Sequence, residues 1–280
     1  MLTIKGISQE HHHDHLEKVA QKTSHPVSDV SFVIAENEII FFEEEGFDKK
    51  PENRTLIQPI LGLRIFDNKL TFATRATFEF LSAPHEAHNN HHSEADTQIE
   101  RIDGFADLGL MSLFSTKHGH EGFIWGLGYS ATFPTASKPE LGTGKYQLGP
   151  AASLFYLGEA YGTGIKSINI GAFIAHEWSY AGDKHREETS LSSIQYVLMY
   201  RLTHTMQIGM EPKVTIDWKE DPGNRLNLPI GLGIGDVFNM GKIPIQWRVE
   251  GQYFLESSQL EKEKFAVVFT LEPILSSLLN

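Results

Sequence analysis

The stretch from Thr205 to Trp218, TMQIGMEPKVTIDW, alternates strictly between two kinds of side chain. One set of alternate residues is apolar: Met206, Ile208, Met210, Pro212, Val214, Ile216 and Trp218. The other set is polar or small: Thr205, Gln207, Gly209, Glu211, Lys213, Thr215 and Asp217. Alternate side chains of a β-strand point to opposite faces. Strands of soluble proteins usually run about 5–6 residues, so a longer strand with this pattern is typical of a transmembrane β-barrel.

The same alternation recurs along the chain between stretches of turn-forming residues. The predicted strands are 31–42, 55–66, 70–80, 99–115, 123–133, 145–157, 166–178, 190–203, 205–218, 226–238, 245–256 and 264–271. About twelve strands is an even number, as in bacterial outer-membrane barrels, and long and short connections alternate as they do there. We therefore predict an all-β fold, a transmembrane antiparallel up-and-down β-barrel with both termini in the periplasm and the loop 83–97 outside.

A large soluble β-protein is the alternative that the alternation leaves open, because its apolar residues would face inward instead. Strand number, strand length and aromatic residues near strand ends favour the membrane. These aromatic residues are Trp125, Tyr129, Trp178, Tyr180, Trp218, Trp247 and Tyr253.

Composition excludes several other classes of function. The net charge of −12 argues against nucleic acid as a partner. The absence of cysteine excludes disulfides and thiolate chemistry. No basic and apolar signal pattern occupies the first 25 residues, so we expect that an exported barrel has lost its secretory signal. We expect a mobile, polar, His-rich segment at 1–29, the barrel at 30–273 and a C-terminal tail at 274–280.

Charged residues on the polar strand faces are the first candidate site, because a membrane barrel turns them toward its lumen. The predicted lumen-lining residues are Arg75, Glu79, Asp107, Glu177, Arg201, Glu211, Lys213, Asp217, Arg248 and Glu250. Side chains fill barrels of about 8 strands, whereas 16–18 strands leave an aqueous channel. Twelve strands lie between these limits. The set predicts a narrow charge-lined passage, with a lumen that salt bridges fill and brace as the alternative.

Histidines that lie close to carboxylates in the sequence form the second candidate site. Imidazole and carboxylate groups together suit Zn²⁺ or Cu²⁺. One group of candidate ligands is the histidine string at 11–15, and the other is His85, His88, His91 and His92 in the predicted outer loop. The alternative is a solvated loop and tail that bind no metal.

Motifs of the common hydrolases and nucleotide-binding enzymes are missing from the sequence, including G-x-S-x-G, H-E-x-x-H and the P-loop. A lipase in the outer membrane would need a Ser–His pair that faces lipid. His176 and Ser192 lie on neighbouring predicted strands with the parity of the apolar face. We expect interface packing for both residues, and we predict that the protein is not an enzyme.

Several longer motifs carry a resemblance to a known family. The run WGLGYSATFPTASKPELGTGKYQLGPAASL is the most extended, and GFADLGLMSLFS, HEWSYAGD, TIDW and LNLPIGLGIGDVFNMGKIPIQWRVEGQYF add to it. Together they resemble the outer-membrane transporter family of the meta-pathway of phenol degradation, over roughly 55–272. The chain departs from that family in its ending, LEPILSSLLN, and in its His-rich segments.

The resemblance implies a barrel in the bacterial outer membrane that passes small hydrophobic or aromatic compounds. Combined with the polar strand faces, it predicts a channel whose partners are the lipid bilayer and a small solute, with no resident cofactor. The alternatives are a surface barrel that binds zinc or copper through 85–96 and a structural barrel with a plugged lumen. The sequence leaves the oligomeric state open.

Overall fold

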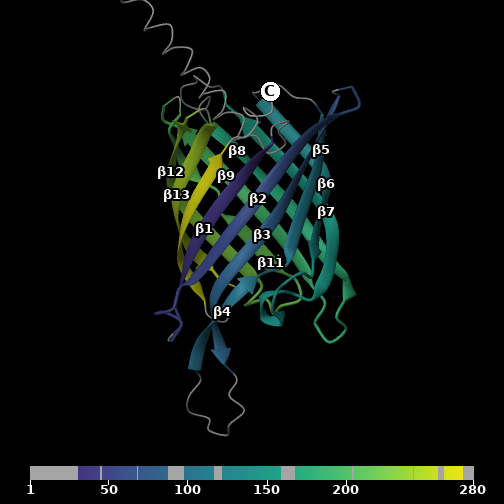
Figure 1. Ribbon diagram of the computed structural model, residues 1–280, viewed down its shortest axis with the longest axis vertical. Helices are drawn as coiled ribbons and strands as arrows, with labels where there is room; N and C mark the ends of the chain where they lie inside the picture. The colour runs from purple at the N-terminus through teal and green to yellow at the C-terminus, as the bar shows by residue number, and fades with distance from the viewer. Residues whose placement is uncertain are drawn as a thin grey trace, which may run out of the picture.

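The computed structural model of the protein describes residues 31–273, except Glu45, Asn68, 88–97, 117–121, 159–167, His204, Lys242 and 258–261. The described chain forms a closed antiparallel barrel of twelve strands (Figure 1). The predicted fold class is therefore confirmed. The expected segments 1–29 and 274–280 lie wholly outside the described residues.

Fourteen strand segments build this barrel, because two of its twelve strands are interrupted. The segments are β1 (Phe32–Phe42), β2 (Glu52–Ile65), β3 (Leu70–Ala87), β4 (Gln98–Phe105), β5 (Leu108–Thr116), β6 (Gly122–Phe133), β7 (Lys145–Leu157), β8 (Ile168–Gly182), β9 (Ser190–Arg201), β10 (Gln207–Met210), β11 (Lys213–Asp217), β12 (Leu226–Met240), β13 (Ile243–Glu256) and β14 (Glu263–Pro273). A short 3-10 helix, η1 (Pro139–Leu141), lies between β6 and β7. Among the described residues, no helix has the length and apolar character needed to cross a membrane.

The ring closes where the first strand meets the last. β1 pairs with β2 on one side and with β14 on the other, where Ala35 lies opposite Leu271. Backbone N–H and C=O groups within a bilayer need partners inside the protein, and a closed barrel supplies them from neighbouring strands. The topology therefore suits a lipid environment.

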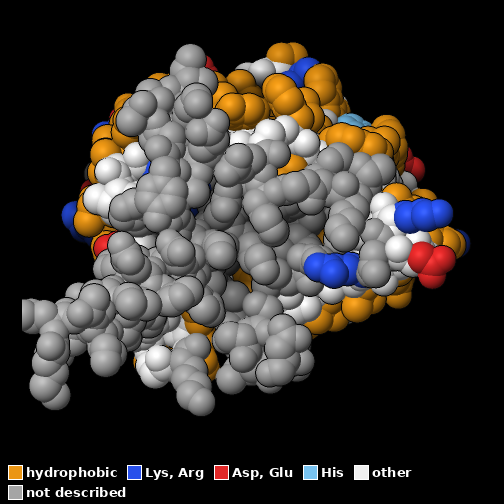
Figure 2. Space-filling view, turned by 90° about the horizontal axis from the view of Figure 1, so that it is seen from above, with side chains coloured by type: hydrophobic (Ala, Val, Ile, Leu, Met, Phe, Trp, Pro, Cys, Tyr) orange, Lys and Arg blue, Asp and Glu red, His pale blue; other side chains and the backbone are white. Residues whose placement is uncertain are grey.

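Large apolar side chains cover the outside of the barrel. On β2 the exposed residues include Ile57, Leu61 and Leu63, and on β12 they include Ile230 and Leu232. Viewed along the axis, hydrophobic side chains gather around the circumference (Figure 2). The apolar set of the alternation thus faces outward, as the membrane interpretation predicts.

The two ends of the barrel carry different connections (Figure 1). We call the end where β1 begins and β14 finishes the terminal end. It carries the connections at 66–69, 117–121, 158–167, 202–206 and 241–242, whereas the opposite, loop end carries mostly longer ones at 43–51, 134–144, 183–189, 218–225 and 257–262.

A hairpin of β3 and β4 projects beyond the barrel at the loop end (Figure 1). The predicted loop 83–97 was therefore too long, since 83–87 pair with 98–102. Pro84 and the polar residues around it obscured the strand, because a strand outside the bilayer needs no continuous apolar face.

Two predicted strands are interrupted rather than continuous. The stretch 205–218 divides at Glu211 and Pro212 into β10 and β11, because proline donates no N–H to a ladder. The predicted strand 99–115 divides at Ala106 and Asp107 into β4 and β5. Both parts of each pair stay aligned on the same neighbouring strand.

Candidate functional site

Three cavities lined by described residues lie inside the barrel and share part of their walls. The one toward the terminal end has a volume of about 90 Å³. Its lining is largely apolar and includes Phe32, Ile34, Ile60, Met111, Phe155 and Phe173. The other two, of about 340 and 480 Å³, carry most of the charged side chains. The lumen therefore changes character along its axis, from apolar near the terminal end to charged toward the loop end.

Arg75 on β3 occupies the junction of the three cavities. Arg75 and Gln195 line all three of them. The Arg75 Nη1 group donates to Gln195 Oε1 at 3.2 Å, and the guanidinium carbon lies 5.2 Å from the centre of the Phe173 ring. A guanidinium over an aromatic face is a favourable contact. Arg75 thus lies where the charged region of the lumen meets the apolar one.

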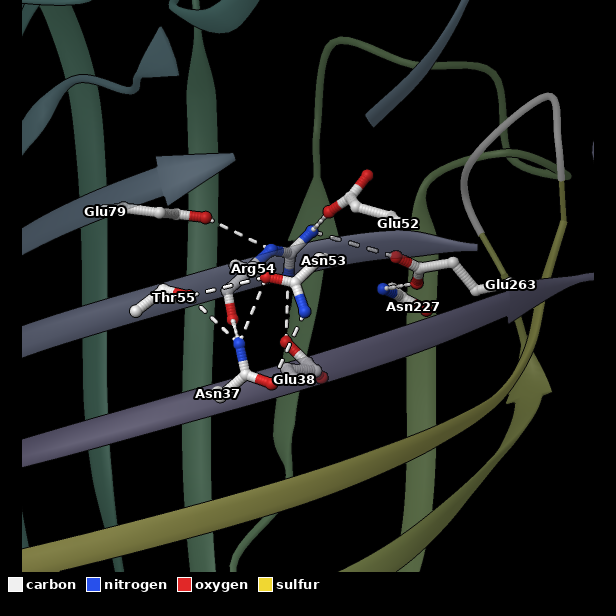
Figure 3. A network of polar contacts seen from close by, with 9 residues as sticks. All are labelled: Asn37, Glu38, Glu52, Asn53, Arg54, Thr55, Glu79, Asn227 and Glu263. Atoms are coloured by element: carbon white, nitrogen blue, oxygen red, sulfur yellow. Dashed lines mark hydrogen bonds and ion pairs between the residues drawn. The ribbon is translucent and has the colours of Figure 1, made fainter. Parts of the chain in front are cut away.

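A second arginine, Arg54 on β2, lines the 340 Å³ cavity and has four carboxylates around it (Figure 3). Its guanidinium nitrogens lie 2.8 Å from Glu52, 3.1 Å from Glu79, 3.3 Å from Glu38 and 4.0 Å from Glu263. Asn227 donates to the other oxygen of Glu263 at 2.6 Å, which ties β12 to the group. We call Arg54 and these four glutamates the Arg54 network.

Arg248 on β13 forms a second ionic cluster deeper in the lumen. Its Nη2 lies 3.0 Å from Glu211 and its Nη1 lies 2.6 Å from Glu250. Gln252 donates to the other oxygen of Glu250 at 3.0 Å. Three of the predicted lumen residues, Glu211, Arg248 and Glu250, are therefore brought together by direct contact.

Glu177 and Asp107, two further predicted residues, line the 480 Å³ cavity and accept hydrogen bonds there. Glu177 accepts from Ser130 and, at 2.7 Å, from Thr132. Asp107 accepts from the Thr143 backbone N–H at 2.7 Å and from the Thr143 hydroxyl at 2.9 Å. Asp107 lies at the interruption between β4 and β5 and anchors the connection 134–144 to the wall.

The remaining predicted residues divide between the cavities and the strand ends. Glu79 and Lys213 line both of the larger cavities. Arg201 and Asp217 are half-buried at the ends of β9 and β11 and line none of the three cavities. Asp217 accepts the backbone N–H of Lys219 at 2.9 Å, a contact that belongs to the following turn.

Carboxylates outnumber cationic groups around the 340 Å³ cavity. Six carboxylates line it: Glu36, Glu38, Glu79, Glu211, Glu263 and Glu272. Four cationic side chains face them: Arg54, Arg75, Lys213 and Arg248. A cleft lined with an excess of one sign concentrates counterions of the other sign, so this region favours cations over anions.

Seven polar residues of the lumen were not predicted from the sequence. The missed polar residues are Glu36, Glu38, Glu52, Arg54, Gln195, Glu263 and Glu272. Four of them fell outside or at the margins of strands whose ends were misplaced: β2 begins at Glu52 rather than 55, and β14 runs from Glu263 to Pro273. In β1, apolar residues occur on both faces, so its strand pattern carries no signal for Glu36 or Glu38.

The histidine candidates fall mainly outside the described residues. His88, His91 and His92 lie there, while His85 is exposed on the projecting part of β3. Within the described residues, no group of three or more His, Asp or Glu side chains is arranged so that it could hold a metal ion. Zinc or copper binding by this loop stays a prediction.

His176 and Ser192 meet on the outer face, as their parity suggested. His176 Nδ1 lies 2.7 Å from Ser192 Oγ, and Ser190 Oγ lies 3.4 Å from Nε2. The Trp218 indole N–H also donates to Ser192, at 2.9 Å, and Trp178 packs against His176 with the ring centres 4.1 Å apart and the ring planes tilted by 60°. Aromatic residues of this kind anchor a barrel at the membrane interface, and the polar contacts fit that role.

Comparison with known proteins shows the fold alone. No family model and no curated protein sequence matches the chain, so the family suggested by the motifs is not confirmed. An outer membrane channel from Pseudomonas putida F1 superposes with a TM-score of 0.62 at 12% identity, over 88% of this chain and 95% of that chain. The NanC porin superposes with a TM-score of 0.50 at 8% identity, over 85% of this chain and 98% of that chain. The chain therefore has the fold of outer-membrane channels.

Proposed function

We propose that this protein is a channel of the bacterial outer membrane that passes small solutes through its lumen. The observation that carries the proposal is the set of cavities that meet at Arg75 inside a barrel whose exterior is apolar. The fold shared with outer-membrane channels supports the location and the class of function. Binding and passage, rather than catalysis, are the activity that such a lumen serves.

The solutes that we propose are small molecules with an apolar or aromatic body and a polar group. Phe155 and Phe173 line the terminal-end cavity together with Arg75 and Glu211. The alternative of a plugged lumen is less favoured, because the Arg54 network lies against the wall and leaves about 340 Å³ of space beside it.

Purified protein is expected to produce discrete conductance steps in planar bilayers and to make liposomes permeable to small solutes. Because carboxylates exceed cationic groups in the lumen, we expect benzylammonium to enter protein-containing liposomes faster than benzoate, as swelling measurements would show. Absence of both conductance and swelling, in protein that shows heat-modifiable gel migration, would leave a structural barrel and overturn the proposal.

We also propose that the terminal end faces the periplasm and the loop end faces the outside. Because the chain lacks cysteine, single cysteines can report the orientation. Lys184→Cys in the loop-end connection should react with a membrane-impermeant maleimide on intact cells. Lys69→Cys, in the exposed turn at the terminal end, should react only after the outer membrane is opened. The reverse labelling pattern would contradict the orientation.

A further inference from the structure

Two carboxylates in the wall of the lumen have no cationic partner in direct contact. Glu36 on β1 and Glu272 on β14 both line the 340 Å³ cavity. The arginines of the two ionic clusters, Arg54 and Arg248, make their ion pairs with other glutamates. Within the described residues, neither Glu36 nor Glu272 has a basic nitrogen within 4.0 Å. Glu36 accepts one hydrogen bond, from the Thr270 hydroxyl at 3.3 Å.

Glu272 is the more isolated of these two residues. It is 8% exposed, yet it lines both the terminal-end cavity and the 340 Å³ cavity. In the described part of the chain its carboxylate makes no hydrogen bond and no ion pair. A buried charge without a partner costs free energy, and ionisable residues within membrane-spanning segments typically serve function. The carboxylate therefore marks a position for a cationic group that a solute supplies.

The register brings the two glutamates close together on the inner face of the barrel. Glu36 pairs with Thr270 across the β1–β14 ladder, and Glu272 is the next residue of β14 on the same face. Diagonal neighbours of this kind lie about 7–8 Å apart, so the two carboxylates border one space. An ammonium group has three N–H donors and no acceptor, which suits a position between two carboxylates.

A positive charge without a carboxylate partner borders the same two cavities. Arg75 lines the terminal-end cavity and the 340 Å³ cavity, as Glu272 does. Its one hydrogen bond within the described residues is to Gln195, and no carboxylate oxygen of these residues lies within 4.0 Å. A guanidinium carries five N–H donors in a planar fork that matches a carboxylate. Arg75 can therefore receive the carboxylate of a solute.

Apolar side chains separate Arg75 from the glutamates along the wall. Three strand boundaries lie between β3, which carries Arg75, and β14, which carries Glu272. At the usual spacing of neighbouring strands this is about 14 Å along the wall, so the opposite charges do not pair directly. Ile60 on β2 and Ile34 on β1 line the terminal-end cavity between them. A small solute in this cavity lies against both charged groups and this apolar strip.

We infer that these groups form a binding site for a zwitterionic solute with an apolar body, namely an α-amino acid with a large apolar side chain. The ammonium group lies between Glu36 and Glu272, and the carboxylate meets Arg75. The apolar body enters the terminal-end cavity beside Phe155 and Phe173. This inference rests on the proposed channel function and names the class of solute, since each end of a zwitterion supplies the charge that one wall lacks.

The first test compares three ligands that differ only in their charged groups. Purified full-length protein in lipid nanodiscs is equilibrated with tritiated phenylalanine, and unlabelled ligands compete for the site. Phenethylamine lacks the carboxylate, and 3-phenylpropionate lacks the ammonium group. We expect phenylalanine to compete about tenfold more strongly than either analogue, because it alone forms charge-assisted hydrogen bonds at both ends.

Substitutions at each end of the site assign the two contacts. Glu272→Gln should weaken phenylalanine and phenethylamine by about fivefold or more, and should not weaken 3-phenylpropionate. Glu36→Gln provides a second, independent test of the ammonium end. Arg75→Gln should weaken phenylalanine and 3-phenylpropionate and should not weaken phenethylamine. Since phenylalanine has no net charge, a change in the overall charge of the lumen does not by itself explain weaker binding in both kinds of variant.

The matched control removes a carboxylate that lies away from the site. Glu100→Gln changes an exposed glutamate of the projecting hairpin that lines none of the three cavities, and it should leave binding of all three ligands unchanged. Heat-modifiable gel migration verifies that each variant is folded, and planar-bilayer conductance is recorded for the parent protein in parallel.

The possible outcomes separate the binding site from the channel. Phenylalanine that does not bind saturably, or whose binding responds to substitutions at only one end, would overturn the zwitterion site, and a protein that still conducts would remain a channel. Binding that depends on both ends, in protein that neither conducts nor makes liposomes permeable, would support the site and contradict the proposed channel. If the protein neither binds phenylalanine nor conducts, both the inference and the proposed function fail.

Discussion

Replacing Arg75 by alanine is expected to raise the single-channel conductance by about two- to threefold and to shift ion selectivity further toward cations. Arg75 lines all three cavities and lies over the Phe173 ring. Its removal widens the junction between the apolar and charged regions. It also takes a positive charge from a lumen in which carboxylates already predominate. Planar-bilayer recordings in asymmetric KCl measure both quantities.

Arg75→Lys separates the effect of side-chain size on conductance from the effect of charge on selectivity, and Arg101→Ala is the control. Arg75→Lys keeps the charge, so we expect its selectivity to stay near that of the parent protein while conductance changes less than in Arg75→Ala. Arg101→Ala removes an exposed arginine of the projecting hairpin that lines none of the three cavities, and it should change neither quantity. Unaltered conductance and selectivity in Arg75→Ala would contradict a passage through this junction.

Replacing Arg54 by methionine is expected to produce the largest loss of stability of any single change in the lumen. Four carboxylates would be left together without the cation that they share. Removing one partner of a buried ion pair typically costs about 3–5 kcal/mol, and since these groups lie beside a cavity we expect about 2–4 kcal/mol. The midpoint of urea unfolding in lipid vesicles, followed by heat-modifiable gel migration, measures the change.

A second set of substitutions is designed to restore stability by removing the repulsion among the glutamates of the Arg54 network, without replacing the positive charge of Arg54. Glu38→Gln and Glu52→Gln in the Arg54→Met background should recover much of the lost stability, because amides carry no net charge. The same two substitutions in the parent protein should be mildly destabilising, since they weaken the contacts of Arg54. If Arg54→Met unfolds at the same urea concentration as the parent, the network contributes nothing to stability.

The barrel could be predicted from sequence because lipid imposes one uniform demand on the outer face. Every outward position within the bilayer favours an apolar side chain, so strands such as 226–238 show a regular alternation. The period of the alternation also placed His176 and Ser192 on the outer face of neighbouring strands, where the structure brings them into contact. Strand number and topology followed from counting such segments.

The residues of the lumen were only partly predictable from sequence. Outward side chains all contact lipid, whereas lumen side chains contact one another, so no single type of residue is favoured there. Phe155 and Phe173 face inward beside Arg75, so polarity no longer distinguishes the two faces of β7 and β8. Partners such as Arg54 and Glu263 are distant in sequence, and no local pattern records their contact. Pro212 and Pro229 likewise lie near each other only through the register of β10–β11 with β12, which places Pro212 opposite Ile230 and Lys213 opposite Pro229.

The Arg54 network has a consequence for the order in which the protein matures after synthesis. Arg54 and Glu38 belong to the first two strands to emerge, whereas Glu263 belongs to the last. Because Glu263 lies on β14, Arg54 gains its full set of counter-charges only when β14 joins β1 and closes the barrel. That same strand supplies the backbone partners of β1. When β14 joins the barrel, it therefore completes the Arg54 network and pairs the free edge of β1 in the same step. A barrel that lacks β14 would have an unpaired strand edge and an incomplete Arg54 network.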